Sequence, residues 1–447
     1  MGSKLYVAGM GLLLLATNAT AEDFTFNYEQ AVERALTLDP RISEREKLVD
    51  VARGMLDEAT NSASWVYDFN AFLGVAPSIR GGFFEGSDGR FDPDSLDFEG
   101  IGPWYNLEFT VVRPLHTYGK IEHYSEAAKN NIAIKQGDVR LEKAQVYMDI
   151  TRAYYGYLAA LDGKYMLEDA LNKLSGALSL AERWAEEGEG KQSDVFALQT
   201  GIGLVQRFSA ELVGMERIAM AALKMLLGLQ PEDSLKLADS RLQPVDLPEM
   251  ELAGLQQKAL TDRPEMGQVD AGLKARRALV AAKNAEAYPN VYAGIGGSFA
   301  YSPERVQTSD VAVYDPFNHA GLTPVLGLKW DWHSGVQEAQ AKQAQAELDA
   351  LVEKKSFALQ GIPFQVAEAY HTVQAKHEMV QQLYQAARSG RRWMITTYAD
   401  FEAGVEEASE VMTALQAYVL AYGDYIRVVN DYNLSVAQLK VVTGEKP

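Results

Sequence analysis

The sequence contains no cysteine among its 447 residues, and this absence excludes several kinds of site. Without thiols the chain has no disulfides, no thiolate metal ligands and no lipid-modified N-terminal cysteine. Only six histidines are present, and their spacing is not that of metal ligands. No glycine-rich phosphate loop and no catalytic triad is present either. We therefore expect no cofactor, no metal and no enzymatic activity.

The sequence also has few basic residues for its acidic content, with 42 Lys and Arg against 61 Asp and Glu. The net charge of −19 argues against nucleic acid as a partner. Long apolar runs are nearly absent as well. The one that stands out, "YVAGMGLLLLA" from Tyr6, precedes the small-residue site Ala19-Thr20-Ala21, so we expect residues 1–21 to be an export signal peptide. No later stretch reaches the roughly 18 apolar residues of a membrane helix. The exported protein is then either soluble or enters a membrane as β-strands.

What the sequence does contain is a duplication. Three pairs of residues are each separated by 216 positions, namely Gly188 and Gly404, Asp194 and Glu410, and Gly228 and Gly444. Motifs that keep their order in this way indicate an internal repeat. We predict a first repeat over residues 22–230, an equatorial connector over 231–250 and a second repeat over 251–447.

The last helix expected in the second repeat carries a seven-residue period. In the second repeat the apolar positions are Ala408, Leu415, Tyr422, Val429 and Val436, together with Val411, Tyr418, Tyr425, Tyr432 and Leu439. This spacing is typical of a coiled-coil seam, whereas an ordinary amphipathic helix would drift from it. The preceding helices, about 120–187 and 337–403, would each be roughly 100 Å long. Such hairpins, with tips near 188–194 and 404–410, must lie against other hairpins to bury their apolar stripes.

Four strands are expected in the segments between the helices, at about 65–76, 104–113, 290–301 and 324–332. Side chains alternate along them, so that Tyr67 and Phe69 lie opposite Asp68 and Asn70. Alternation is typical of transmembrane β-strands and also of a half-buried soluble sheet, and the signal peptide favours the membrane. Four tryptophans near the strand ends are expected to face the membrane: Trp65, Trp104, Trp330 and Trp332.

Four strands are too few for a closed barrel, which takes about eight or more. An open sheet in lipid would leave edge N–H and C=O groups unpaired, at several kcal/mol each. The sequence therefore predicts an α+β membrane protein in which several chains share one barrel. The number of chains does not follow from this arithmetic.

At this point the motifs resemble a known family. "ALTLDP" from Ala35, "ALTDRP" from Ala259, the Gly-x5-Asp/Glu-Val hairpin tips and the terminal "LKVVTG" are similar to the TolC-like outer membrane efflux proteins. The resemblance implies a homotrimer with a shared twelve-stranded β-barrel, four strands per chain, and a periplasmic α-helical coiled-coil tunnel. It also implies contact with outer membrane lipid of a Gram-negative bacterium, a periplasmic adaptor protein and an inner-membrane pump or ABC exporter. The expected function is the exit duct of a tripartite efflux system.

Two other functions remain open at this stage. The same duct could serve a type I protein secretion system, because the two roles share one fold. The third hypothesis is a periplasmic coiled-coil structural or adhesive protein with a small soluble sheet, which would need no lipid-facing aromatic residues.

The hairpin tips are acidic, and Gly188 and Gly404 interrupt the helices there. The resemblance places Asp194 and Glu410 at the periplasmic aperture, where symmetry would repeat each acid into a negative ring. A simpler interpretation is that these carboxylates lie near helix N-termini because each stabilises its helix there by about 0.3–1 kcal/mol.

Relatives of this kind hold the aperture closed through a tyrosine and an arginine that bond to an acid of the neighbouring hairpin. The corresponding residues here are Phe401, which has no hydroxyl, and Glu406, which has the wrong charge. We therefore expect this lock to be missing. Lys191 is the nearby cation that could replace it by pairing with Glu406 or Glu407.

Overall fold

The computed structural model describes residues 22–80, 84–85, 90–91, 97–249, 251–305, 314–331, 333 and 335–445. The expected signal peptide, residues 1–21, lies outside the described residues. Contacts divide the chain into two units. The helical unit comprises the described residues within Met1–Ser43, Leu141–Ala259 and Ile362–Pro447, and the strand unit comprises those within Glu44–Arg140 and Leu260–Gly361. Among the described residues, no helix has an apolar stretch long enough to cross a membrane.

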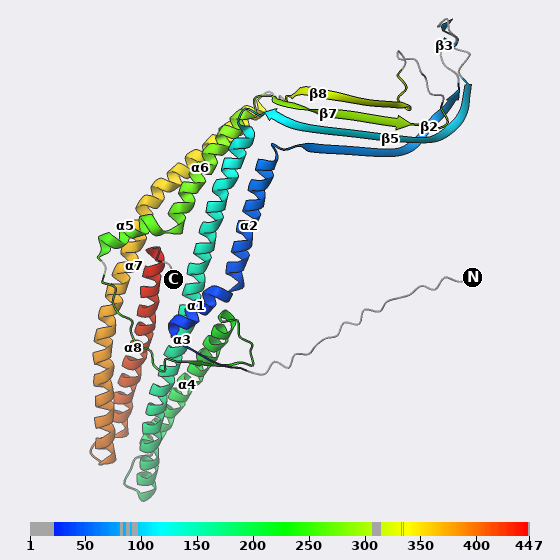
Figure 1. The fold of residues 1–447 in the computed structure, drawn as a ribbon. Coiled ribbons are helices and arrows are strands. Elements are labelled where there is room, and N and C mark those ends of the chain that lie inside the picture. Colours follow the sequence, from blue (N-terminus) through cyan, green and yellow to red (C-terminus); the bar gives the residue numbers. More distant parts are fainter. Residues whose placement is uncertain are drawn as a thin grey trace, which may run out of the picture. The chain divides into compact units, whose positions relative to one another are not determined.

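The two halves of the chain form the same series of elements (Figure 1). The first series is β1 (Asp23–Phe26), α1 (Tyr28–Leu38), α2 (Pro40–Asn61), β2 (Val66–Arg80), β5 (Asp97–His116), α3 (Lys120–Glu187) and α4 (Gln192–Leu226). The second is β6 (Ser234–Leu237), α5 (Leu252–Asp262), α6 (Pro264–Ala285), β7 (Asn290–Tyr301), β8 (His319–Lys329), α7 (Val336–Glu402) and α8 (Ala408–Val442). Two short strands, β3 (Phe84–Glu85) and β4 (Arg90–Phe91), pair with each other between β2 and β5. The long helices α3 and α7 have 68 and 67 residues, and α4 and α8 have 35 each, which confirms the duplication.

The helical unit is built around the seam that the seven-residue period predicts. Eight of its positions in α8 are buried: Ala408, Val411, Leu415, Tyr418, Val429, Tyr432, Val436 and Leu439. Tyr422 and Tyr425 are half-buried. Near the hairpin tips the seam packs into one cluster with buried side chains of α3, α4 and α7. The two hairpins of this unit therefore share a core.

The connector between the repeats binds both hairpins of the helical unit. β6 pairs in parallel with β1, and the chain then passes along the helices. Asn433 of α8 donates from Nδ2 to the Gln243 carbonyl at 2.8 Å and accepts from the Val245 N–H at 3.0 Å. The buried carboxylate of Asp162 in α3 accepts from the Leu242 N–H at 3.0 Å. The connector thus fixes α3 and α8 through its backbone groups.

The strand unit contains one antiparallel sheet in the order β2-β5-β7-β8 (Figure 1). β2 and β5 are longer than expected, because their pairing continues through Gly100, Gly102 and Pro103, where the apolar alternation fades. β8 lies at His319–Lys329 rather than at about 324–332, since residues 319–321 pair with β7 although they are not strongly apolar. Within the described chain, β2 and β8 each have a strand partner on one side only.

Each hairpin tip turns at a glycine in the left-handed conformation. After α7, Gly404 has φ of +74°, its N–H donates to the Phe401 carbonyl and the Val405 N–H donates to the Asp400 carbonyl, both at 2.9 Å. These two bonds form a Schellman motif, which satisfies the last carbonyls of the helix. After α3, Gly188 has φ of +78° and the same motif forms. The Gly188 N–H donates to the Ala185 carbonyl and the Glu189 N–H donates to the Trp184 carbonyl.

We expect Gly404→Ala to lower the free energy of unfolding by about 1 kcal/mol, because a side chain disfavours positive φ. A Cβ there would meet no atom within 4 Å, so the cost is conformational rather than steric. The control is Gly54→Ala, in the exposed middle of α2 and equally free of contacts, which should be stabilising by about 0.5–1 kcal/mol. Denaturant unfolding in detergent measures both. Equal effects of the two substitutions would contradict the assignment of the turn.

Candidate functional site

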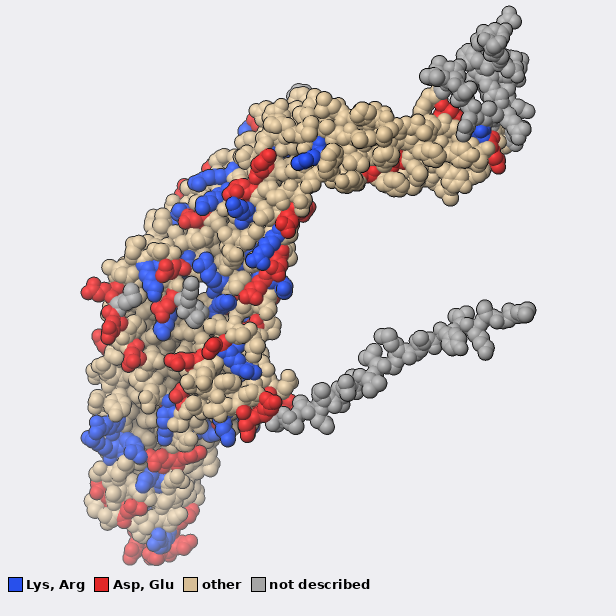
Figure 2. Space-filling view, viewed as in Figure 1, with Lys and Arg blue, Asp and Glu red and all other residues tan. Residues whose placement is uncertain are grey.

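One face of the sheet, here called the apolar face, consists almost entirely of exposed hydrophobic side chains. Its members are Tyr67, Phe69, Leu73 and Val75 of β2, Tyr105, Leu107 and Phe109 of β5, Ile295, Phe299 and Tyr301 of β7, and Leu322, Leu326 and Leu328 of β8. Leu73 and Leu326 are each 77% exposed. Figure 2 shows few charged side chains over these strands. An apolar surface that spans four strands indicates a partner other than water.

The opposite face, the polar face, carries the alternate residues of the same strands. They include Asp68, Asn70, Asn106, Glu108, Thr110, Ser298, His319 and Thr323. The pairing register keeps the two sets on opposite sides of the sheet across all four strands. The polar face also carries apolar side chains, among them Phe72, which is 54% exposed. One surface is suited to an apolar medium and the other to water.

The tryptophans do not all lie where the sequence suggested. Trp65 and Trp330, at the ends of β2 and β8 nearest the helices, are 49% and 57% exposed. Trp330 also donates from Nε1 to the Ala287 carbonyl at 3.2 Å. Trp332 lies outside the described residues. Trp104 was also expected to face the membrane, and its register partner Gly74 places it on the polar face, opposite the exposed hydrophobic set.

The sequence analysis selected Trp104 by residue type and did not select two tyrosines that the strand alternation places among the hydrophobic residues. Tyr105 and Tyr301 are cross-strand partners on the apolar face, 46% and 38% exposed. They lie toward the end of the sheet that is distant from the helices. Tyrosines at such a position are suited to a membrane–water interface.

At the hairpin tips, the acids occupy equivalent positions of the two repeats. Asp194 is the third residue of α4 and Glu410 the third residue of α8. Asp194 is half-buried and Glu410 is exposed. The N-cap residues are Lys191 and Glu407, and neither side chain caps its helix. Carboxylates in the first turn therefore interact with the helix dipole, which agrees with the simpler interpretation of their presence.

The structure brings Lys191 and Glu407 together. Lys191 Nζ lies 2.8 Å from Glu407 Oε1 and joins the tips of the two hairpins, although each side chain is 65% exposed. The hydrogen bond raises the pKa of Lys191 above its ordinary value and lowers the pKa of Glu407 below its own. Glu406 is exposed, and its N–H donates to the Asp400 carbonyl. Of the two acids that Lys191 was expected to bind, it pairs with Glu407.

Phe401, which was expected at the periplasmic aperture, has a buried side chain within the chain itself. Its side chain is 2% exposed and packs edge-on against Trp184 of α3, with the ring centroids 5.3 Å apart. Phe401 precedes the Gly404 turn by one helical turn and faces the other hairpin. It is therefore part of the core that joins the tips.

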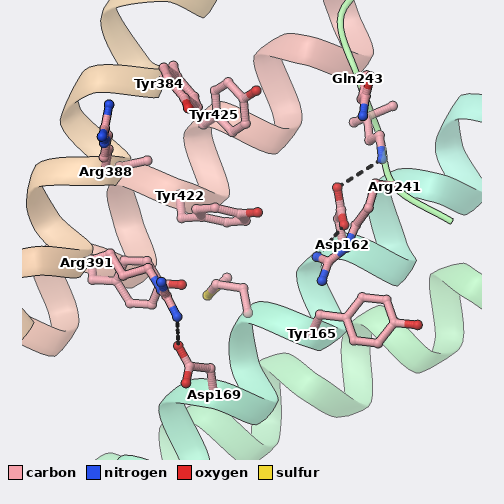
Figure 3. A pocket seen from close by; sticks show the side chains of 14 residues that line it. Asp162, Tyr165, Asp169, Arg241, Gln243, Tyr384, Arg388, Arg391, Tyr422 and Tyr425 are labelled. Atoms are coloured by element: carbon pink, nitrogen blue, oxygen red, sulfur yellow. Dashed lines mark hydrogen bonds and ion pairs between the residues drawn. The ribbon is translucent and has the colours of Figure 1, made fainter. Parts of the chain in front are cut away.

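A cleft of about 590 Å³ lies between the hairpins on the side of the connector (Figure 3). Asp162, 6% exposed, accepts from Arg241 Nη1 at 2.8 Å, and the Arg241 guanidinium lies 4.4 Å from the centre of the Tyr165 ring. Deeper along α3 and α7, Asp169 and Arg391 approach to 3.6 Å. These contacts join the connector and both hairpins, so we interpret the cleft as a polar junction. Among the described residues no cluster could hold a metal ion.

Tyrosines of α8 line the same cleft. Burial raises the pKa of Tyr418 to about 12, and it raises the pKa values of Tyr422 and Tyr425 as well. All three therefore remain neutral at physiological pH. Their heptad spacing and burial agree with a packing role, as the sequence indicated.

Comparison with known proteins agrees with this geometry. Residues 255–445 match the sequence model of a family described as Outer membrane efflux protein. The cation efflux system protein CusC of Escherichia coli O157:H7 is 25% identical over 235 residues, which are 51% of this chain and 48% of CusC. The match thus spans about half the length of CusC and about half the length of this chain.

Solved structures extend the likeness to the fold of nearly the whole chain. The outer membrane channel CmeC of Campylobacter jejuni has a TM-score of 0.76 at 12% identity and covers 94% of this chain and 86% of its own. The outer membrane protein VceC of Vibrio cholerae has a TM-score of 0.72 at 15% identity and covers 93% and 96%. The second repeat carries the sequence pattern of the outer membrane efflux proteins, the chain has the fold of their channels, and the predicted resemblance to this family is confirmed.

Proposed function

We propose that this protein forms an outer membrane channel, the exit duct of a tripartite efflux system in a Gram-negative bacterium. The observation that carries the proposal is the open sheet, with an apolar face, a polar face and two unpaired edges. In lipid, each unpaired edge group costs several kcal/mol, so the edges of β2 and β8 need partner strands. Those strands come from further copies of the same chain, with the apolar face toward lipid and the polar face toward a water-filled lumen.

We infer a homotrimer, in which three sheets of four strands give a barrel of twelve. A closed barrel needs about eight strands or more, so two copies would already reach the minimum, and the family resemblance favours three. The helical unit supports assembly independently. On α4 an exposed apolar stripe with coiled-coil spacing is formed by Leu204, Phe208, Met215, Ile218 and Met225. In the assembly, this stripe would pack against the helices of the next copy.

The transported material would be small molecules or ions delivered by a periplasmic adaptor and an inner-membrane pump. Two observations favour this role over protein secretion: the matching family is described by efflux, and CusC is named a cation efflux system protein. A passive duct leaves selection mainly to its pump, and the described residues contain no metal-binding cluster that would select an ion within this chain.

The acidic tips would form the periplasmic aperture of this duct. Within residues 186–194 and 400–410, Lys191 is the sole cation. Its bond to Glu407 connects the tips of two hairpins, which is the place where the family lock is missing. We infer that this pair, together with the buried contact of Phe401 and Trp184, holds the hairpin tips together and so keeps the aperture narrow.

The orientation of the sheet is tested by an arginine on each face. We expect Leu326→Arg, on the apolar face, to lower the stability of the membrane-inserted protein by about 2–4 kcal/mol, because the charge would enter lipid. Thr323→Arg, on the polar face of the same strand, should have little effect, since it would enter the lumen. Unfolding by guanidinium in lipid vesicles measures both. Equal losses for the two variants would contradict the assignment of the faces.

The aperture is tested by charge reversal. We expect Lys191→Glu to raise the single-channel conductance of the purified protein in a planar bilayer, because it replaces an attraction between the tips by a repulsion. The double variant Lys191→Glu with Glu407→Lys restores an opposite pair and should return the conductance toward the original value. Unchanged conductance in Lys191→Glu would show that the pair does not hold the aperture.

The same pair determines the pH dependence of the aperture. Glu407 has a pKa below its ordinary value of 4.5, so its contribution is complete above that value and is lost as the pH falls through the lowered pKa. Lys191 has a pKa above 10.5, so its charge is lost only as the pH rises through the raised value. Conductance should therefore be constant near neutral pH and should increase in acid below 4.5. In Lys191→Glu the acid step should have the opposite sign, because protonation removes the repulsion between the two carboxylates.

A further inference from the structure

The described parts of the connection between β7 and β8 lie against one face of the sheet. These parts, residues 302–305 and 314–318, are here called the strap. The ring of Phe317 contacts the ring of Trp104 on the polar face, with centroids 5.5 Å apart. On the same face the Ser78 hydroxyl donates to the Glu304 carbonyl at 2.8 Å. The strap therefore covers the polar face at the end of the sheet that is distant from the helices.

Burial of the sheet residues shows the same asymmetry. Beneath the strap, Ala76 and Ser78 of the polar face are 0% and 5% exposed. Their neighbours on the apolar face, Val75 and Ile101, are each 68% exposed. Gly102 of the polar face has no space for a side chain, because a Cβ there would meet the carboxylate of Glu304. The strap is thus packed against one face at van der Waals distance.

An ion pair with little exposure joins the two parts of the strap to each other. Arg305 and Asp315 have side chains that are 14% and 10% exposed, and Nε and Nη2 of the guanidinium each lie 3.2 Å from a carboxylate oxygen. Arg305 Nη1 also donates to the Pro77 carbonyl of β2 at 2.9 Å, and the guanidinium lies over the Phe317 ring at 4.8 Å. A shielded pair with its remaining donors satisfied resists opening, because removal of either partner leaves a buried charge.

Further bonds close the base of the strap. The Asn318 side chain accepts from the Ser302 N–H at 2.7 Å, and the Ser302 hydroxyl donates to the Pro103 carbonyl of β5 at 3.1 Å. Ser302 is 1% exposed. The strap is consequently bonded to β2 and β5 as well as to its own two ends, and we treat it as a fixed part of the sheet surface.

We propose that the strap is a built constriction of the lumen at the outer exit of the channel, and that it limits the size of the solutes that leave. This inference rests on the proposed function, since the polar face becomes the lumen wall only in a shared barrel. Symmetry would then place one strap from each copy around the exit. The residues that set the limit are Phe317 and Trp104, held in place by Arg305 and Asp315.

The lack of cysteine in the chain permits a direct test from outside the cell. Thr110→Cys places one thiol on the polar face of β5, six residues beyond Trp104 and therefore about 20 Å from it along the strand. Intact cells that carry this variant are treated with two membrane-impermeant maleimides, one small and one bearing a bulky polymer. With the strap intact, we expect the small reagent to react readily and the bulky reagent to react slowly.

Release of the strap should change the rate for the bulky reagent alone. In Thr110→Cys with Arg305→Ala and Asp315→Ala, we expect this rate to rise roughly tenfold, because a wider pore admits larger solutes, while the rate for the small reagent stays the same. Phe317→Ala, which trims the ring and keeps the ion pair, is a second variant that should act in the same direction. The matched control is Asp331→Asn, which removes an exposed ion pair with Lys329 at the other end of the sheet and should change neither rate.

Two results would overturn the inference, and they differ in what else they exclude. If the bulky reagent reacts with Thr110→Cys as fast as the small one while the strap is intact, the constriction is absent. The proposed channel function is unaffected by that result. If Leu326→Cys, on the apolar face, reacts with the small reagent as fast as Thr110→Cys does, then lipid does not shield that face. In that case the proposed channel fails together with the inference.

Discussion

The pairing of backbone groups at the edges of the sheet is the constraint on which the rest of this structure depends. A four-stranded sheet with one apolar face is stable neither in water, which leaves that face exposed, nor alone in lipid, which leaves two edges unpaired. Copies of the chain that share one barrel solve both problems at once. The barrel in turn gives the polar face a function, because that face then surrounds water.

The duplication supplies the helices that such an assembly needs. Each repeat ends in a hairpin of a very long helix and a 35-residue helix, and each tip closes with the same glycine turn. The shared core near Phe401 and Trp184 and the bond between Lys191 and Glu407 join the tips of both repeats within one chain. Repetition of a single folding unit thus produces paired hairpins, and the connector between the repeats binds them through Asp162 and Asn433.

The sequence predicted those features that depend on periodicity. Eight of the ten heptad positions of α8 are buried, and alternation along the strands correctly separated Tyr67 and Phe69 from Asp68 and Asn70. It failed where the answer depends on contacts between distant segments. Trp104 was assigned by residue type against its own register, and the burial of Phe401 depends on Trp184 in another helix. The partner of Lys191 was narrowed to two acids by charge alone, but the geometry of the turn selects Glu407.

The strap illustrates the same limit, because Arg305 and Asp315 lie in a polar loop with no periodic signal and acquire their role only in the folded sheet.

The central claim is that one chain supplies only part of a closed barrel. Native mass spectrometry of the protein extracted from the outer membrane in detergent tests it most directly. The account predicts a complex of three chains, and a stable single chain in detergent would contradict it.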